Sequence, residues 1–429
     1  MKLPVNYSFA LLWGGLSVVS TQPFDAEYNA LKSRYIVSLK AGVGGDALHG
    51  HIQWVQDVHR KRGLLQDDIS GVEKTFDVGT FHAYSGSFDE ETLLEIRGSD
   101  IVELVEPDTP VYPFGIVTQN QATWGLGAIS QAEPVSINAS LRNGFEYTYD
   151  ENGGKGTFAY VVDSGVWVDN PDFEGRAELG YTVYPEIPFE DSSGHGTHVA
   201  GTIASKTWGV AKKAQVIAVK VIAPNQGVMS DFMEGFSWSV KNITETPGRA
   251  AVSVINMSLG RSTLRKQPTL AISEANIGTK GGPTNYAFNS LVHAASEQGV
   301  LSVIAAGNAA VDVSRVSPAG TARAITVAAS AVNNTAWNFS NFGSGVDLYA
   351  PGVDIYSLSL EAGKDVALSG TSMASPHVAG LALYLKSLET GLETVDAITA
   401  RILELCKRGT VQGVPGSTPN FLAFNGVGV

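Results

Sequence analysis

The sequence predicts an α/β protein whose larger, C-terminal part is a doubly wound, mostly parallel sheet. From residue 155 onward, apolar segments of strand length alternate with helical segments such as 231–241 and 289–298. The apolar segments carry few polar residues, which is typical of strands buried on both faces of a parallel sheet. These predicted strands cover residues 156–162, 214–221, 251–257, 301–305 and 324–328.

Residues 32–107 predict a smaller α+β unit with the ferredoxin-like element order β-α-β-β-α-β. In its first helix, Leu48, Ile52 and Val55 share one face. Glycines and acidic residues mark the ends of both helices. The predicted elements are strand 35–40, a helix from Asp46 to Gly63, strands 72–76 and 81–88, a helix from Asp89 to Gly98, and strand 101–105.

Two further segments divide the chain. Residues 1–20 predict a secretory signal peptide, because Lys2 precedes an apolar run, 9–19, that is too short to span a bilayer. Residues 108–121 contain two prolines and no helical period, so they predict an exposed linker of the kind that proteases cleave. The larger domain is then expected to cover residues 122–429.

Composition limits the kinds of protein and the partners that this chain can represent. A chain of 429 residues with 44% hydrophobic and 17% charged residues predicts a folded protein of more than one domain. The formal net charge of −13 argues against nucleic acid or an anionic membrane as the main partner. The single cysteine, Cys406, excludes an intrachain disulfide, and its apolar neighbours predict a buried, unreactive thiol.

Ser372 is expected at the start of a helix. It follows Gly370, and the apolar residues Ala374, Val378, Leu381 and Leu385 repeat at helical spacing after it. Unpaired backbone N–H groups at a helix N-terminus favour developing negative charge, so a serine there is a candidate nucleophile that still needs a base. By itself, a serine in this position is more commonly an N-cap.

Three other polar residues follow predicted strands or open a helix. Asp163 ends an apolar strand, where a carboxylate needs a partner and could hold an imidazole. His195 stands between two glycines, and its unperturbed pKa suits proton transfer near neutral pH. Asn308 follows strand 301–305, and its amide could donate to an oxyanion.

Each of these residues also has a simpler interpretation. An isolated Asp or Gly-Asn is most often a turn residue. His195 and His198 could bind a metal, although no third ligand stands at the usual spacing. We expect His198 and His377 to pack in the core.

The four positions together, in the order Asp, His, Asn, Ser, resemble the subtilisin-like serine proteases, in particular the fungal proteinase K group. The segments HGTHVAGT, 195–202, and GTSMASPHVAG, 370–380, carry most of the likeness, which covers most of residues 118–429. The resemblance implies a catalytic triad and an oxyanion donor at Asp163, His195, Ser372 and Asn308. It also implies substrate-binding residues at Gly227, Val228, Ser258, Leu259, Gly260, Ala305, Ala306 and Gly307.

Residues 32–107 resemble the inhibitory propeptide of the same family. The resemblance implies a zymogen with an intramolecular inhibitor, released by cleavage near Val117 and Thr118. The alternative is a permanent accessory domain.

The expected function is therefore that of a secreted, monomeric serine endopeptidase acting on polypeptides through an acyl-enzyme. The resemblance implies broad specificity with an apolar or aromatic preference before the cut, and no cofactor for the chemistry. Asp347 matches a calcium ligand of the proteinase K group, whose other ligands are backbone carbonyls. Ala322 stands where those relatives have a proline, so a structural Ca²⁺ stays an open expectation.

Other functions are also compatible with the sequence. The polar segment 261–286 leaves open a vacuolar or precursor-processing subtilase of narrow specificity, or it is a tolerated surface insertion. A catalytically silent binding protein could share the fold. Secretion would make glycosylation sites of the sequons at Asn138, Asn242, Asn333 and Asn338, whereas the sequon at Asn256 lies in an apolar strand.

Overall fold

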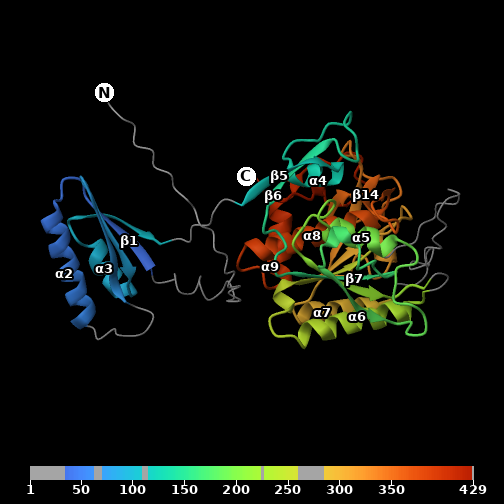
Figure 1. Cartoon of the computed structure of the whole chain (residues 1–429), viewed down its shortest axis with the longest axis horizontal. Helices are drawn as coiled ribbons and strands as arrows, with labels where there is room; N and C mark the ends of the chain where they lie inside the picture. Colours follow the sequence, from blue (N-terminus) through green and yellow to red (C-terminus); the bar gives the residue numbers. More distant parts are fainter. Residues whose placement is uncertain (1–33, 62–69, 109–114, 224–226, 259–284, 428–429) are drawn as a thin grey trace, which may run out of the picture. The chain divides into compact units, whose positions relative to one another are not determined.

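The computed structural model describes residues 34–61, 70–108, 115–223, 227–258 and 285–427 (Figure 1). The chain divides into two compact units, residues 1–113 and 114–429. The predicted signal peptide, Leu259, Gly260 and nearly all of segment 261–286 lie outside the described residues.

The N-terminal unit is a four-stranded antiparallel sheet in the order β2-β3-β1-β4, packed against two helices. Val37, Leu48, Tyr84 and Leu93 bring side chains from the sheet and both helices into one core. The predicted ferredoxin-like order is confirmed. Its elements are β1 (Arg34–Leu39), α2 (Gly45–Lys61), β2 (Gly71–Val78), β3 (Phe81–Ser87), α3 (Glu90–Arg97) and β4 (Val102–Pro107).

The predicted linker is too long at its C-terminal end. Residues 116–121 belong to β5 (Ile116–Ala122), which pairs antiparallel with β6 (Phe145–Asp150) in the C-terminal unit. Most of β5 is exposed, so polar residues such as Gln119 and Asn120 leave no apolar pattern for a sequence argument to find. The segment between the last strand of the N-terminal unit and β5 is residues 108–115.

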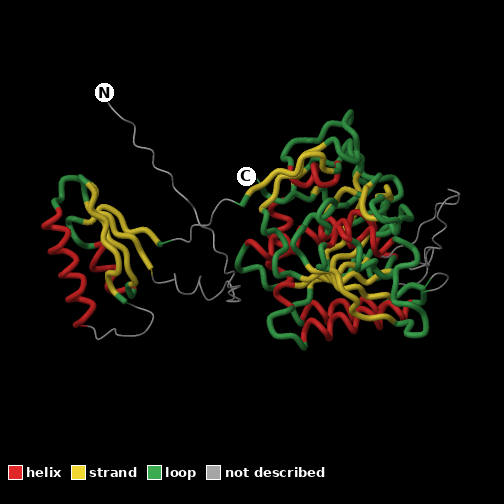
Figure 2. Tube along the Cα trace, viewed as in Figure 1, coloured by secondary structure: helices red, strands yellow, loops and turns green. Residues whose placement is uncertain are grey.

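A nine-stranded sheet organises the C-terminal unit, in the order β16-β17-β13-β12-β11-β10-β7-β9-β8. Figures 1 and 2 show the strands of this sheet between helices. Every pairing in it is parallel except that of β16 with β17, so the doubly wound, mostly parallel prediction is confirmed. Its strands are β7 (Phe158–Asp163), β8 (Ala177–Thr182), β9 (Gln215–Lys220), β10 (Ser253–Met257), β11 (Leu301–Ala305), β12 (Ile325–Ser330), β13 (Leu348–Pro351), β16 (Lys407–Arg408) and β17 (Phe421–Leu422).

Helices cover both faces of this sheet, with α5 and α8 on one face and α6 and α7 on the other (Figure 1). Ala159 and Val161 of β7 face the α8 side, whereas Tyr160 and Val162 of the same strand face the α6 side. This alternation explains the uninterrupted apolar run in the sequence. The helices are α4 (Trp124–Ser130), α5 (His195–Ala204), α6 (Met229–Thr244), α7 (Tyr286–Glu297), α8 (Thr371–Leu388) and α9 (Val395–Leu405).

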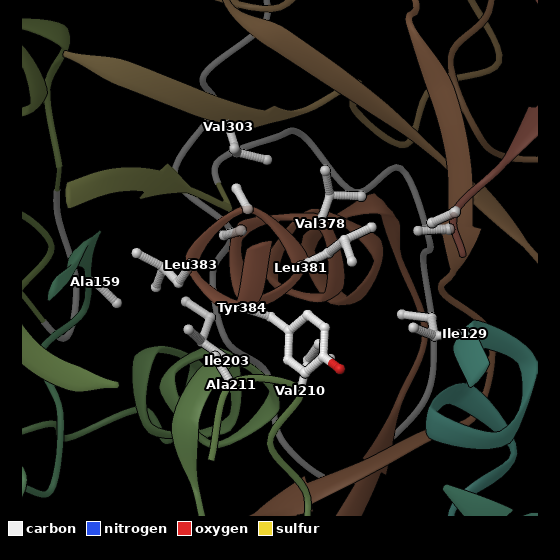
Figure 3. Packing of buried hydrophobic residues seen from close by; sticks show 14 of the residues in the cluster. Ile129, Ala159, Ile203, Val210, Ala211, Val303, Val378, Leu381, Leu383 and Tyr384 are labelled. Carbon is white, nitrogen blue, oxygen red and sulfur yellow. The ribbon is translucent and has the colours of Figure 1, made fainter. Parts of the chain in front are cut away.

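Helix α8 is buried along nearly its whole length. Figure 3 shows Val378, Leu381 and Leu383 among residues from neighbouring elements, including Ile203 of α5 and Val303 of β11. Such close packing gives the N-terminal turn of α8 a rigid support. A hairpin of β14 (Ile355–Leu358) and β15 (Asp365–Leu368) precedes the helix.

Cys406 is 5% exposed, and burial raises the pKa of its thiol to about 12. The predicted burial of the thiol is confirmed, and the raised pKa disfavours the reactive thiolate. Within the described residues, none of the helices combines the length and the apolar character needed to cross a bilayer.

Candidate active site

The polar residues singled out from the sequence gather at the carboxyl edge of the parallel sheet. Asp163 is the last residue of β7, and Ser258 directly follows β10, the strand beside it. Strand order reverses at this pair, because β9 and β8 lie beyond β7 while β11 to β13 lie beyond β10. Doubly wound sheets bind their ligands at such a reversal.

Asp163 and His195 form a short hydrogen bond. The distance from His195 Nδ1 to Asp163 Oδ1 is 2.7 Å, and Asp163 is fully buried. The backbone N–H of Ser164 donates to the same oxygen at 2.7 Å. Because an ionised carboxylate can only accept, the neutral imidazole carries its proton on Nδ1 and leaves Nε2 as an acceptor.

A second buried carboxylate, Asp191, holds the loop that carries His195. Its Oδ1 accepts from the Ser164 hydroxyl at 2.9 Å and from the Gly194 N–H at 2.9 Å. Its Oδ2 accepts from the Thr197 N–H and hydroxyl at 2.9 and 2.7 Å. Gly194, the N-cap of α5, has no side chain to accept hydrogen bonds from the first helical turn. Asp191 accepts the bond from the Thr197 N–H of that turn instead.

Lys220 completes this buried polar group. Its ammonium donates to the Ser164 carbonyl oxygen at 2.6 Å, and burial lowers its pKa. Neither Asp191 nor Lys220 was among the site residues predicted from the sequence. Asp191 stands four residues before His195 in a Ser- and Gly-rich loop, which was the available signal.

Ser372 is the second residue of α8 and is 6% exposed. Its hydroxyl donates to the Ser258 carbonyl oxygen at 3.1 Å, and the Ser258 hydroxyl donates to the Ser372 carbonyl oxygen at 2.9 Å. These two bonds join the end of β10 to the first turn of α8. Helix α8 also packs directly against α5, which begins with His195.

The side-chain amide of Asn308 has a defined orientation. Its Oδ1 accepts from the Thr371 N–H at 2.9 Å and from the Thr371 hydroxyl at 2.8 Å. A backbone N–H can only donate, so the oxygen must face Thr371 and the NH₂ group must lie at the other end. A Cβ placed on Gly370 would stand 3.3 Å from Asn308 Nδ2, so the donor lies close to the turn that precedes Ser372. The sequence analysis missed the role of Thr371.

The remaining predicted substrate-binding residues lie near the same edge or outside the described residues. Ala305 ends β11, Ala306 follows it fully buried, and Gly307 adopts a left-handed φ of 99°. Val228 is 56% exposed and is the N-cap of α6, directly after Gly227. Leu259 and Gly260 lie outside the described residues.

His198 and His377 pack in the core, as expected. Burial lowers the pKa of His198 to about 3 and that of His377 to about 4. His198 Nε2 lies 2.9 Å from the Ile355 carbonyl oxygen, and His377 Nδ1 lies 2.8 Å from that of Met373. Among the described residues, no group of three or more His, Cys, Asp or Glu side chains is arranged to hold a metal.

Asp347, the predicted calcium ligand, accepts from the Thr326 N–H at 2.7 Å. Burial raises the pKa of its carboxyl to about 6. A buried carboxylate of this kind suits a cation, but Ca²⁺ takes six to eight oxygen ligands. Asp347 would supply one carboxylate of such a set, and the resemblance to the proteinase K group implies backbone carbonyls as the other protein ligands.

Comparison with protein-family profiles matches residues 154–416 to the Subtilase family, a range that includes Asp163, His195, Asn308 and Ser372. The chain belongs to the subtilase family. Residues 34–113 match the Peptidase inhibitor I9 family, so an inhibitor domain precedes the peptidase. The chain is a serine endopeptidase of the subtilisin-like type.

Relatives match this subtilase over nearly its whole length. Subtilisin-like proteinase Mp1 of Magnaporthiopsis poae is 46% identical over 92% of this chain and 91% of its own. Alkaline protease 1 of Emericella nidulans is 43% identical over 98% of both chains. Among solved structures, a cold adapted subtilisin-like serine proteinase matches with a TM-score of 0.58 and 34% identity, covering 71% of this chain and 99% of that one.

Proposed function

We propose that this subtilase hydrolyses peptide bonds through an acyl-enzyme, with Asp163, His195 and Ser372 as its catalytic triad. The observation that carries the proposal is the 2.7 Å bond from His195 Nδ1 to the buried Asp163 carboxylate. It leaves Nε2 as the proton acceptor, on a helix that packs against the helix bearing Ser372. The decisive experiment replaces Ser372 with alanine and measures the loss of peptide hydrolysis.

The chemistry follows from the proton positions. The Ser372 hydroxyl turns from the Ser258 carbonyl toward the imidazole, and its oxygen attacks the peptide carbonyl carbon while His195 Nε2 takes the proton. The tetrahedral intermediate collapses as the C–N bond breaks and His195 returns the proton to the leaving amine. Water then attacks the ester while His195 takes a proton from it, and the peptide leaves as a carboxylic acid when His195 returns the proton to the Ser372 oxygen. Asp163 stabilises the imidazolium in both halves.

The developing oxyanion is stabilised by the Asn308 amide and the backbone N–H of Ser372. Support for Asn308 comes from Thr371, which holds Oδ1 and thereby presents the NH₂ group. Preorganised donors of this kind act without reorganising during the reaction. No cofactor takes part in these steps.

Substrates are polypeptides bound along the cleft edges, with Gly227 and Val228 on one side and Ser258 on the other. The sequence resemblance adds Leu259 and Gly260 to the expected substrate-binding residues. Ala305, Ala306 and Gly307 carry small side chains or none, which suits an apolar or aromatic residue before the cut. We expect cleavage of a randomised peptide library at many sequences, enriched in such residues at that position. A requirement for Lys or Arg, or for one extended sequence, would instead identify a precursor-processing enzyme.

The precursor is secreted as a monomer and is inhibited by its own N-terminal unit until the chain is cut near Val117 and Thr118, the second and third residues of β5. Support comes from the inhibitor domain at residues 34–113 and from the apolar run at 9–19. N-terminal sequencing of the product would test signal removal and propeptide removal together. Recovery of the protein from the culture medium would distinguish secretion from the vacuolar alternative.

The sequons differ in their exposure. Asn138, Asn333 and Asn338 are exposed and can carry glycans, whereas the Asn242 side chain accepts a bond from the Tyr160 hydroxyl.

A structural Ca²⁺ at Asp347 has a measurable signature. Burial raises the pKa of Asp347 from 3.8 to about 6 in the folded state. The free energy of unfolding therefore falls as the pH rises through this range, because the buried carboxyl becomes ionised. At pH 8 the unpaired charge costs at most about 3 kcal/mol. With one carboxylate we expect a dissociation constant of about 1 mM, so 10 mM Ca²⁺ should raise Tm by about 2–4 °C at pH 8. The measurement is thermal unfolding with Ca²⁺ or chelator.

The control is Asp347→Asn, which removes the charge and keeps the shape of the side chain. This variant should lose the response to Ca²⁺ and should be no less stable than the native chain in chelator at pH 8. An equal response of both proteins would place the ion elsewhere.

A further inference from the structure

The loop that carries Asn308 is held from one side by a single buried side chain, Asn341, which is 1% exposed. Its Nδ2 donates to the Ala306 carbonyl oxygen at 2.7 Å. Its Oδ1 accepts from the N–H groups of Ala309 and Val311 at 3.0 and 3.1 Å. The amide of Asn341 therefore binds the backbone on both sides of Asn308.

These bonds stabilise a backbone path that the loop sequence does not favour by itself. Ala310, between the two N–H groups that reach Asn341, has a left-handed φ of 51°, and Gly307 has one of 99°. The contact at Gly307 is close, because a Cβ added there would stand 2.5 Å from Asn341 Nδ2. The side chain of Asn341 thus lies close against residues 306–311 and binds their backbone at three points.

We infer that Asn341 is a positioning residue for the oxyanion donor. Thr371 orients the Asn308 amide, and Asn341 sets where the backbone of Asn308 lies. The inference rests on the proposed role of Asn308 as the donor. Oxyanion donors act only when they stand at hydrogen-bond distance from the position of the charge, and a misplacement of about 1 Å costs up to about 10²-fold in rate.

The fold should survive loss of this side chain, because backbone bonds between the two segments remain. The Asn341 N–H donates to the Gly307 carbonyl oxygen at 2.8 Å, and Ala310 donates to Phe339 at 3.0 Å. The neighbouring Ser340 hydroxyl accepts from the Ala329 N–H in β12 at 3.2 Å, which ties the segment to the sheet. Removing the amide should therefore loosen the loop without detaching it.

The test is a double-mutant cycle with Asn308→Ala and Asn341→Ala, using a chromogenic peptide anilide and active-site titration. We expect Asn341→Ala to lower kcat by about 10- to 100-fold, while KM changes less than about threefold. In the Asn308→Ala background, the same substitution should lower kcat by less than about twofold. Asn341→Asp keeps the acceptor and the shape but replaces the donor that faces Ala306, and it should show the same coupling even if the alanine variant folds poorly.

The matched control is Asn425→Ala. Asn425 is 4% exposed, and its amide also bonds to backbone groups, those of Thr148 and Val427. This variant should lose thermal stability and keep kcat.

Two outcomes would separate the inference from the proposed function. If Asn308→Ala leaves kcat unchanged, the proposed oxyanion role fails. If Asn308→Ala is impaired but the Asn341 substitutions reduce kcat by the same factor in both backgrounds, or lower only Tm, then Asn341 is a purely structural residue and the inference is overturned.

Discussion

Replacing Ser372 with alanine should lower kcat by about 10⁶-fold while the protein keeps its fold. The size of this loss is that of subtilisin and does not come from the present geometry. The physical reason is that the Ser372 hydroxyl supplies the oxygen that forms the ester, whereas the hydroxyl of the adjacent Thr371 is bound to Asn308 and Gly307. The measurement is steady-state hydrolysis of a peptide anilide, with Tm as the check on folding. If the chain processes itself, the full-length precursor should also accumulate uncut.

Ser387→Ala on the same helix is a suitable control. Its hydroxyl bonds to the Gly154 N–H and to the Tyr384 carbonyl oxygen near the other end of α8. That variant should lose some stability and retain its turnover. Peptidase activity that survives Ser372→Ala at the native level would end the assignment of Ser372 as the nucleophile.

Replacing Asp163 with asparagine should lower kcat by about 10⁴-fold, a magnitude typical of serine-protease triads. The variant removes the charge that stabilises the imidazolium, and an amide NH₂ facing Nδ1 would favour the wrong tautomer of His195. The native enzyme should gain activity as the pH rises through roughly 6–7, where an ordinary imidazole becomes neutral. The measurement is kcat across pH 5–10 for both proteins.

Asp312→Asn is the control for this experiment, because Asp312 also accepts a backbone N–H, that of Ser314, but contacts none of the triad residues in the described structure. It should leave the pH profile unchanged. An Asp163→Asn enzyme with native turnover and a native profile would show that the carboxylate of Asp163 does not assist His195.

In the C-terminal unit, the strands predicted from the sequence are central strands buried on both faces, although the short buried strand β13 was missed. Residues 301–305, for example, form β11 as predicted, because a central strand of a parallel sheet has no exposed face to interrupt its apolar run. Strand β8 was missed because Glu178 and Leu179 are exposed and its apolar pattern is weak. Strand β5 was taken as linker because its pairing partner, β6, starts more than 20 residues later.

The site residues also fall into two groups, those that local motifs predicted and those that only long-range contacts identify. Asp163, His195, Asn308 and Ser372 stand in dense local motifs, and the structure places all four at one edge of the sheet. Thr371 lies within one of the motifs, but its contact with Asn308 spans 63 positions of the chain. The contact of Asn341 with Ala306 spans 35. No local pattern reveals such partners.

The sequence by itself determined the fold class, the two-unit organisation and the four residues proposed for the chemistry. These depend on short-range patterns, namely apolar period, helix starts and glycine turns, which neighbouring residues specify directly. Only the tertiary structure decided which side chains hold the residues proposed for the chemistry: Asp191 binds the loop of His195, Thr371 binds the Asn308 amide, and Asn341 binds the backbone around Asn308. Asn341 binds backbone N–H and C=O groups, Asp191 binds backbone N–H and hydroxyl groups, and Thr371 binds the side-chain oxygen of Asn308. Backbone groups occur in every residue, so packing decides which of them a side chain reaches, and the local sequence does not reveal the choice.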